Sequence, residues 1–243
     1  MEHRMKKTVD VQFVDLGLID YKKAWDYQED IFGKFLQIKA KNRDLPENNQ
    51  VAIENQLIFC EHPHVYTLGK SGHQNNLLIS DELLKKIDAT YYKINRGGDI
   101  TYHGPGQIVG YPIIDLEKFH LQVKQYIANL EQSIILTLEE YGIKGERMPG
   151  ATGVWLDSDN AKARKVCAIG VKASRFITMH GFAFNVNTNL EYFNYINPCG
   201  FVDKGVTSME NELGEKVDYE GVKGVLKSKL AKVFGMNLKE KKI

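Results

Sequence analysis

The chain has 243 residues, of which 43% are hydrophobic and 26% are charged, and its formal net charge is +1. This length suits one large domain with a sizeable core or two small ones, and the ordinary composition excludes a disordered, fibrous or low-complexity protein. A net charge close to zero gives a nucleic-acid partner no electrostatic support from the molecule as a whole.

The N-terminal sequence and the cysteines both indicate a cytoplasmic protein. The first ten residues, MEHRMKKTVD, are basic but lack the apolar core of a signal peptide, and no stretch approaches the roughly 20 apolar residues that span a bilayer. The three cysteines are an odd number without regular spacing, which argues against a disulfide framework and fits a reducing compartment. We therefore predict a cytoplasmic location and no membrane contact.

The first half of the chain predicts one long helix between β-type segments. Residues 11–20 predict a strand that passes into a helix over about 20–42, because apolar side chains recur there at helical spacing. The polar residues 42–50 predict an exposed loop. Further β-type runs are expected at 55–69, where Pro63 interrupts the run, at 89–95 and at 107–116, with a short helix at 80–86.

The second half predicts two amphipathic helices, over about 119–141 and 219–234, each followed by a glycine. Between them lie three β-type segments, GVWLD, KVCAIGVKA and ITMHGFAFNVN, separated by polar turns. Strands that cluster between long helices, without strict βαβ alternation, indicate an α+β fold with a mixed β-sheet packed with helices. We expect a single domain over residues 1–243, with a small C-terminal lobe from about residue 205 as the alternative.

Residues 94–116, INRGGDITYHGPGQIVGYPIIDL, hold more glycine and polar side chains than a plain connection needs. Arg96-Gly97-Gly98 matches neither of the common phosphate-binding glycine motifs, and on its own it fits a tight turn equally well. However, glycines let a ligand approach backbone N–H groups that can hold an oxyanion, and Tyr102 and His103 add polar tips. We predict that this segment forms the wall of a pocket for an acyl chain and its carbonyl.

This segment resembles the signature of the octanoyltransferase family, also called lipoyl(octanoyl) transferases or lipoate-protein ligase B. The likeness covers most of residues 55–208 in the expected order. It continues through EHPHVYTLGKSG (61–72), GVWL (153–156), KVCAIGVK (165–172), HGFAFNVN (180–187) and NPCG (197–200). The resemblance implies the α+β fold of the biotin and lipoate-protein ligase catalytic domains.

Among the cysteines, Cys199 is the candidate nucleophile. It lies between a proline and a glycine on a predicted loop, where a thiol can be exposed, whereas Cys60 and Cys167 sit in apolar strands and are predicted to be inert. Lowering a thiol pKa from about 8.5 to about 7 takes roughly 2 kcal/mol. A single ammonium about 4 Å away supplies on the order of 4 kcal/mol at an effective dielectric constant of 20, so one lysine suffices.

Sequence spacing alone leaves four lysines open as the partner of this thiol, namely Lys162, Lys165, Lys172 and Lys204. The resemblance selects Lys165, because the family pairs a lysine at this motif with the cysteine of NPCG. It also implies the substrate-binding residues of the acyl pocket. These are Arg96, Gly97, Gly98, Asp99, Ile100, Thr101, Tyr102, His103, Ala168, Ile169, Gly170, Gly181, Phe182 and Ala183.

The resemblance further implies an acyltransferase with a Cys/Lys dyad. Cys199 attacks octanoyl-acyl carrier protein and forms an octanoyl thioester, which then passes to a lysine of a lipoyl domain in a ping-pong order. The expected acceptors are the lipoyl domains of 2-oxoacid dehydrogenase E2 subunits and the glycine cleavage H protein. The donor thioester is already activated, so ATP, metal and other cofactors are not expected.

Three alternatives remain open at this point. An ATP-dependent lipoate or biotin ligase needs an adenylate-binding segment and has no use for the thiol of NPCG, and a non-catalytic acyl-carrier binding module has no reason to keep a thiol beside a lysine.

His62 and His64 have a spacing compatible with a metal, but Pro63 lies between them and no third ligand is obvious. His180 fits a pocket residue or a structural histidine, and Arg147 fits an acidic carrier or a solvated loop.

Overall fold

The computed structural model describes residues 8–197 and 204–241. The α-helices are α1 (Tyr21–Asn42), α2 (Asp81–Lys86), α3 (Val123–Glu139), α4 (Met209–Leu213) and α5 (Tyr219–Phe234), and the 3-10 helices are η1 (Glu47–Asn49), η2 (Gln74–Asn76) and η3 (Leu190–Tyr195). The strands are β1 (Val9–Leu18), β2 (Gln56–Glu61), β3 (Val65–Leu68), β4 (Thr90–Lys93), β5 (Ile100–His103), β6 (Gln107–Ile113), β7 (Glu146–Met148), β8 (Ala151–Leu156), β9 (Arg164–Ser174), β10 (Ile177–Asn185), β11 (Gly205–Val206) and β12 (Met236–Glu240).

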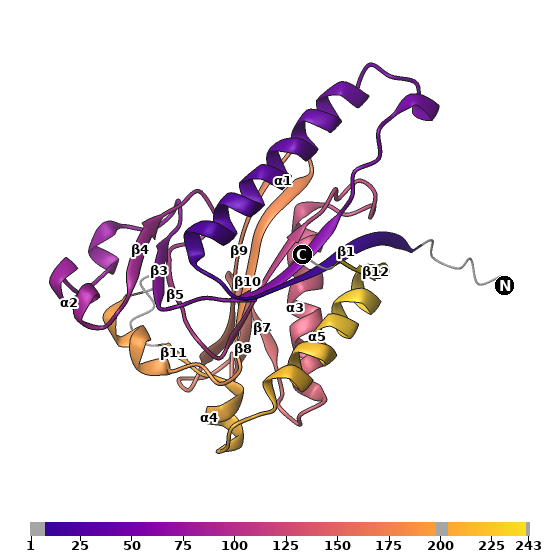
Figure 1. Ribbon diagram of the computed structural model, residues 1–243. Helices are drawn as coiled ribbons and strands as arrows, with labels where there is room; N and C mark the ends of the chain where they lie inside the picture. The colour runs from indigo at the N-terminus through magenta and orange to yellow at the C-terminus, as the bar shows by residue number, and fades with distance from the viewer. Residues whose placement is uncertain (1–7, 198–203, 242–243) are drawn as a thin grey trace.

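The main sheet is mixed. Its strands follow the order β12-β1-β2-β6-β10-β9-β8-β7, and β11 pairs with β9 outside this path. Strand β1 runs parallel to both β12 and β2, and β11 runs parallel to β9, whereas the other pairs are antiparallel. Helices cover both faces of the sheet (Figure 1). The predicted α+β fold with a mixed sheet is therefore confirmed.

Alternating side chains along the strands build two cores on opposite faces of the sheet. Phe59 and Phe182 belong to the cluster that packs under α3 and α5. Ile58, which precedes Phe59 on β2, and Val109 on β6 belong to the cluster that packs under α1. Figure 1 shows α1 on one side of the sheet and α3 and α5 on the other. The face under α1 is the one that carries the site described below.

The chain closes on itself at the outer edge of the sheet. Strand β12 pairs with β1, with Met236 opposite Val9, and α5 packs on α3 through Leu226 and Leu230. The expected helices over 20–42, 119–141 and 219–234 correspond to α1, α3 and α5. The division of the chain into domains stays a prediction.

A second, smaller sheet has the order β4-β3-β5. The run expected at 55–69 is divided at His62-Pro63-His64, and its two halves become β2 in the main sheet and β3 in the small one. The small sheet has its own core, in which Tyr66, Leu68, Ile100 and Tyr102 pack under α2 and η3. This arrangement places the glycine-rich turn between β4 and β5 next to the main sheet.

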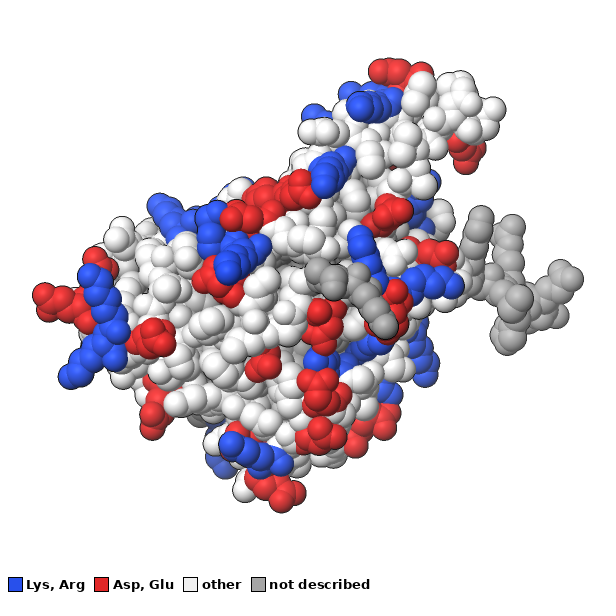
Figure 2. Space-filling view, viewed as in Figure 1, with Lys and Arg blue, Asp and Glu red and all other residues white. Residues whose placement is uncertain are grey.

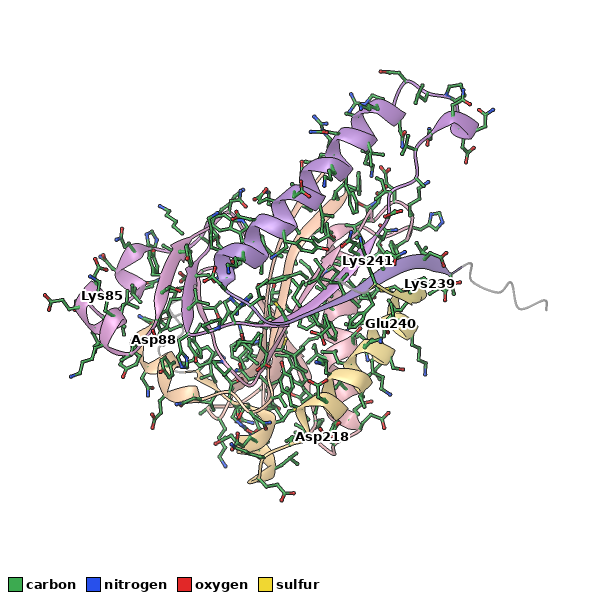
Figure 3. All side chains as sticks on the ribbon, in the orientation of Figure 1. Lys85, Asp88, Asp218, Lys239, Glu240 and Lys241 are labelled. Atoms are coloured by element: carbon green, nitrogen blue, oxygen red, sulfur yellow. The ribbon has the colours of Figure 1, made fainter. Side chains whose placement is uncertain are left out.

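Charged side chains of both signs are interspersed over the face shown in Figure 2, including the length of α1. In Figure 3 the labelled Lys85 and Asp88, around the end of α2, lie at the opposite side of the molecule from Lys239 and Glu240 on β12. Across residues 8–197 and 204–241, no helix has the length and apolar character needed to cross a membrane.

Candidate active site

The site begins with two pairs of small residues at the centre of the main sheet. In the register of β9 and β10, Gly170 lies opposite Gly181 and Ala168 lies opposite Ala183. Because Phe182 faces α3 and α5, its neighbours Gly181 and Ala183 face the other side of the sheet. Four adjacent positions with little or no side chain leave a hollow on that face. A cavity of about 440 Å³ lies there.

The glycine-rich turn forms the opposite wall of this cavity. The N–H of Gly97 donates a hydrogen bond of 2.9 Å to the carbonyl of Val171 on β9. The guanidinium of Arg96 donates to the carbonyl of Thr67 at 2.7 Å, to its hydroxyl at 3.0 Å and to the carbonyl of Gly97 at 2.9 Å. Gly98 has a φ of +85°, which only glycine adopts easily. Arg96 thus fixes the turn against β3, and the N–H of Gly97 holds the turn to β9.

Twelve of the fourteen residues predicted to bind the substrate line the cavity, and the exceptions are Gly97 and Tyr102. Gly97 is engaged with β9 as described. Tyr102 is fully buried in the small sheet, where its hydroxyl lies 2.7 Å from Nδ1 of His64 and its ring stacks on Tyr192 at 5.0 Å between centroids. The expectation that Tyr102 offers a polar tip to the pocket therefore does not fit its position.

Two histidines line the cavity, and both are held neutral near pH 7. Burial lowers the pKa of His103 to about 3, and its Nδ1 and Nε2 lie within hydrogen-bond distance of Gln107 (2.9 Å) and the hydroxyl of Thr67 (3.3 Å). Burial also lowers the pKa of His180 to about 3, and its Nε2 has no hydrogen-bond partner among the described residues. An imidazole that stays neutral shapes the wall but does not supply a cation at pH 7.

The histidines considered as a metal pair point to different neighbours. His62 is fully buried, with Nδ1 2.8 Å from the carbonyl of Ile19 and Nε2 2.8 Å from the hydroxyl of Tyr111. His64 instead stacks on Tyr192 at 4.0 Å between ring centroids. Within the described part of the chain, no group of three or more His, Cys, Asp or Glu side chains could hold a metal ion.

Of the four candidate lysines, Lys165 and Lys204 line the cavity. Lys165 lies on β9, where Trp155 of β8 is its register partner on one side and Val206 of β11 on the other. Its Nζ lies 4.6 Å from the centroid of the Trp155 ring, and the Nζ of Lys204 lies 6.0 Å from the same centroid. Two ammonium groups therefore meet one indole inside the cavity.

The other two candidate lysines lie elsewhere. Lys172 donates to Glu29 of α1 at 3.3 Å and lies 4.6 Å from the ring centroid of Phe32. Lys162 lies on an exposed turn, where its N–H donates to the side chain of Asn160. Arg147 is bound to α3, with Nε 3.0 Å from the carboxylate of Glu131.

The candidate nucleophile Cys199 lies outside the described residues. On either side of it in sequence, Phe193 and Lys204 line the cavity. Cys60 and Cys167 are buried, as predicted, and burial raises the pKa of both thiols. Both are thus poor nucleophiles at neutral pH.

Sequence reasoning missed several residues of the wall. Tyr111, Trp155 and Phe193 stand inside or beside the motifs, but no feature of their spacing singled them out. Tyr21 comes from the start of α1, more than 70 residues before the glycine-rich turn, and its ring stacks on His103 at 5.9 Å between centroids. Such a contact depends on tertiary packing, so local sequence carries no sign of it.

Comparisons with known proteins agree with this architecture. Residues 20–231 match the family model "Lipoyl protein ligase A/B catalytic domain". The structure is similar to a lipoate-protein ligase A bound with ATP, with a TM-score of 0.72 and 13% identity over 97% of this chain and 90% of that one. It is also similar to a structure of the bipartite lipoate protein ligase and its E2 lipoyl domain from Thermoplasma acidophilum, with a TM-score of 0.67 and 12% identity over 97% and 88% of the two chains. At these identities, the likeness shows the fold alone.

The sequence relatives are much closer. The chain is 55% identical to the octanoyltransferase of Cytophaga hutchinsonii over 98% of this chain and 97% of that protein. It is 51% identical to the octanoyltransferase of Bacteroides thetaiotaomicron over 91% and 94% of the two chains. The chain therefore belongs to the octanoyltransferase family, within the lipoyl protein ligase A/B catalytic domain.

Proposed function

We propose that the protein transfers an octanoyl group from octanoyl-acyl carrier protein to the ε-amino group of a lysine on a lipoyl domain, the first step of endogenous protein lipoylation. The proposal assigns the thiol of Cys199 as the nucleophile and Lys165 as its partner. It names as acceptors the lipoyl domains of 2-oxoacid dehydrogenase E2 subunits and the glycine cleavage H protein. A cytoplasmic location belongs to the same proposal.

The observation that carries the proposal is the cavity beside Lys165. It runs along Ala168, Gly170, Gly181 and Ala183, and about five residues separate Lys165 from Gly170 on the same strand. At about 3.3 Å per residue, this is about 16 Å of extended backbone, enough for an eight-carbon chain to lie along it. Binding of an aliphatic chain in such a channel is favourable because its apolar surface is removed from water. Transfer by relatives that share 51–55% of the sequence points the same way.

The chemistry consists of two acyl transfers. The thiolate of Cys199 attacks the donor carbonyl, a new C–S bond forms, and the C–S bond to the carrier breaks and releases the carrier thiol. The amine of the acceptor lysine then attacks the enzyme thioester, a C–N bond forms, and the C–S bond to Cys199 breaks. As a cation, Lys165 stabilises the thiolate of Cys199 and then gives its proton to the departing carrier sulfur. In the second step the neutral amine of Lys165 takes up the proton that the attacking amine loses.

The decisive test is the mass of the intact protein after incubation with octanoyl-acyl carrier protein. We expect the mass of one octanoyl group, located on Cys199 by peptide analysis, and its loss when a lipoyl domain is added. Cys199→Ser is expected to abolish transfer. Lys165→Ala is expected to lower transfer at least about 100-fold while the fold is retained, as for other residues that move protons in catalysis.

Lys162→Ala is the matched control, because Lys162 precedes the same strand but lies on an exposed turn. It should transfer octanoyl like the unmodified chain. Full transfer by the Cys199→Ser protein, or a requirement for ATP, would refute the proposal. The ATP result would favour a ligase, which shares this fold.

A further inference from the structure

We propose that Trp155 is a positioning residue for Lys165, in which the face of the indole holds the lysine ammonium in the cavity. This inference rests on the proposed role of Lys165 and assigns what keeps that side chain in place. The observation is the short distance of 4.6 Å between Nζ of Lys165 and the centroid of the Trp155 ring. A cation within about 6 Å of an indole centroid is attracted by the negative face of the ring.

The indole is itself rigidly held, as a positioning group must be. Trp155 is 2% exposed, and its Nε1 donates a hydrogen bond of 2.9 Å to the carbonyl of Ala151 on the same strand. Trp155 and Lys165 are also register partners on β8 and β9, so the backbone of both strands sets the spacing between ring and ammonium. Neither the ring nor the base of the lysine can move without disturbing the sheet.

The aliphatic part of the Lys165 side chain lies over Gly153. A Cβ placed on Gly153 would lie 3.4 Å from both Cδ and Cε of Lys165, and 2.5 Å from the carbonyl of Cys167. Gly153 has a φ of +121°, and its N–H donates to the carboxylate of Glu131 on α3 at 3.1 Å. The glycine therefore lets the lysine stem lie flat on β8 and directs its ammonium to the ring.

The charged groups near the ammonium of Lys165 show why an aromatic face is needed to stabilise its cationic form. Among the described residues, Lys204 before β11 has its ammonium over the same indole, and Cys167 on β9 itself interacts electrostatically with Lys165. Lys204 opposes the cationic form of Lys165 because like charges repel. The buried thiol of Cys167 is neutral, since burial raises its pKa. The aromatic face offsets part of the repulsion and of the cost of removing the ammonium from water.

The test measures the titration of Lys165 directly. The intact protein is labelled with a trace of an amine-reactive ester over a range of pH, and the label on the Lys165 peptide is measured by mass spectrometry. Trp155→Leu should lower the midpoint of this titration by about 0.4 to 1.5 pH units, which corresponds to a change of about 2- to 30-fold in the protonation equilibrium. Trp155→Phe, which keeps an aromatic face, should lower the midpoint by less and covers the case in which the leucine variant fails to fold.

Tyr126→Leu is the control, because it removes a fully buried aromatic ring of the main core that does not line the cavity. It should lower stability and leave the midpoint of Lys165 unchanged. An unchanged midpoint in folded Trp155→Leu protein overturns the inference, and so does an equal shift in the Tyr126→Leu protein.

The same variants separate this inference from the proposed function. The rate of octanoyl transfer plotted against pH should fall on the acid side as the thiolate is protonated and on the basic side as the ammonium is deprotonated. Trp155→Leu should move the acid limb to higher pH and the basic limb to lower pH, so that the active pH range becomes narrower. A merely structural loss would lower the rate at every pH without moving either limb. If the unmodified chain failed to transfer octanoyl at all, the proposed function would fail, and the labelling midpoint would still decide the role of Trp155.

Discussion

At the scale of single residues, the site depends on glycines, because the absence of a Cβ atom lets neighbouring backbone segments approach closely. Gly170 and Gly181 face each other across β9 and β10, and each lies against backbone of another segment. A Cβ on Gly181 would be 2.0 Å from the carbonyl oxygen of Gly110, and a Cβ on Gly170 would be 2.8 Å from that of Gly97. Since backbone cannot swing away as a side chain does, the close approach of these strands and of the glycine-rich turn requires glycine.

Gly170→Ala tests this requirement. The added methyl would meet Gly97 and the Arg96 side chain at 2.8 and 3.1 Å, so the turn must move away from β9. We expect a loss of about 1–3 kcal/mol in the free energy of unfolding and a clear fall in octanoyl transfer. Gly224→Ala is the control, because Gly224 lies on the exposed side of α5 with no atom within 4 Å of its Cβ position, and it should stabilise the protein by about 0.5–1 kcal/mol. Urea unfolding of both variants decides the point, and a neutral Gly170→Ala would contradict this account.

The sequence was informative about this wall because its motifs are local. The segments around Arg96, Ala168 and Gly181 were each recognisable on their own, and the structure brings them to one cavity. It was less informative about where each side chain points. Tyr102 and His103 are neighbours on β5, so they face opposite sides of the strand, and only His103 can reach the cavity. Which of the two side chains faces the cavity depends on how β5 pairs with β3, and the local sequence does not encode that pairing.

At the scale of elements, the helices were predictable and the sheets were not. Helix α1 begins at Tyr21 after the N-cap Asp20, whose carboxylate accepts a hydrogen bond from the N–H of Lys23, and its apolar positions recur at helical spacing. By contrast, the parallel pairing of β1 with β12 joins residues more than 220 positions apart. A pairing of that kind is fixed by the packing of the whole chain, and local pattern does not encode it.

Helix α1 is fastened to the sheet near its C-terminal end by a largely buried ion pair. Lys39 donates to the carboxylate of Asp115, just beyond β6, and the side chains are 16% and 4% exposed. The N–H of Asp115 in turn donates to the side chain of Asn55 before β2 at 2.8 Å. The same lysine also lies 2.9 Å from the carboxylate of Glu117. This cluster joins the helix to the segments that enter and leave two central strands.

We expect Lys39→Met to lower the free energy of unfolding by about 1–3 kcal/mol, because it leaves the nearly buried carboxylate of Asp115 without its cation. Lys34→Met is the matched change on the same helix, since the pair of Lys34 with Asp30 is exposed to solvent on both sides, and its effect should stay within about 0.5 kcal/mol. Urea unfolding at pH 7 measures both. Equal effects of the two substitutions would mean that burial adds nothing to the Lys39 pair.

At the scale of the whole molecule, the buried histidines tie stability to pH. His62, His103 and His180 lie between α1 and the two sheets, and burial lowers their pKa values to about 4, 3 and 3. In the unfolded chain a histidine titrates near pH 6.5. Below that pH the unfolded chain binds protons that the folded protein does not, so the free energy of unfolding falls as the pH drops from about 6.5 towards 4.

The size of this effect can be tested at His62, which is fully buried. At pH 5.5, one unit below its unfolded pKa and above its folded value of about 4, His62 should cost about 1.4 kcal/mol of stability relative to neutral pH. We therefore expect the urea midpoint of the protein to fall between pH 7.5 and pH 5, and His62→Gln, which can still bond to Tyr111, to show a flatter fall. His73→Gln, at an exposed position, should keep the full slope. Parallel curves for the His62 and His73 variants would show that protonation of the buried imidazole is not what destabilises the protein in acid.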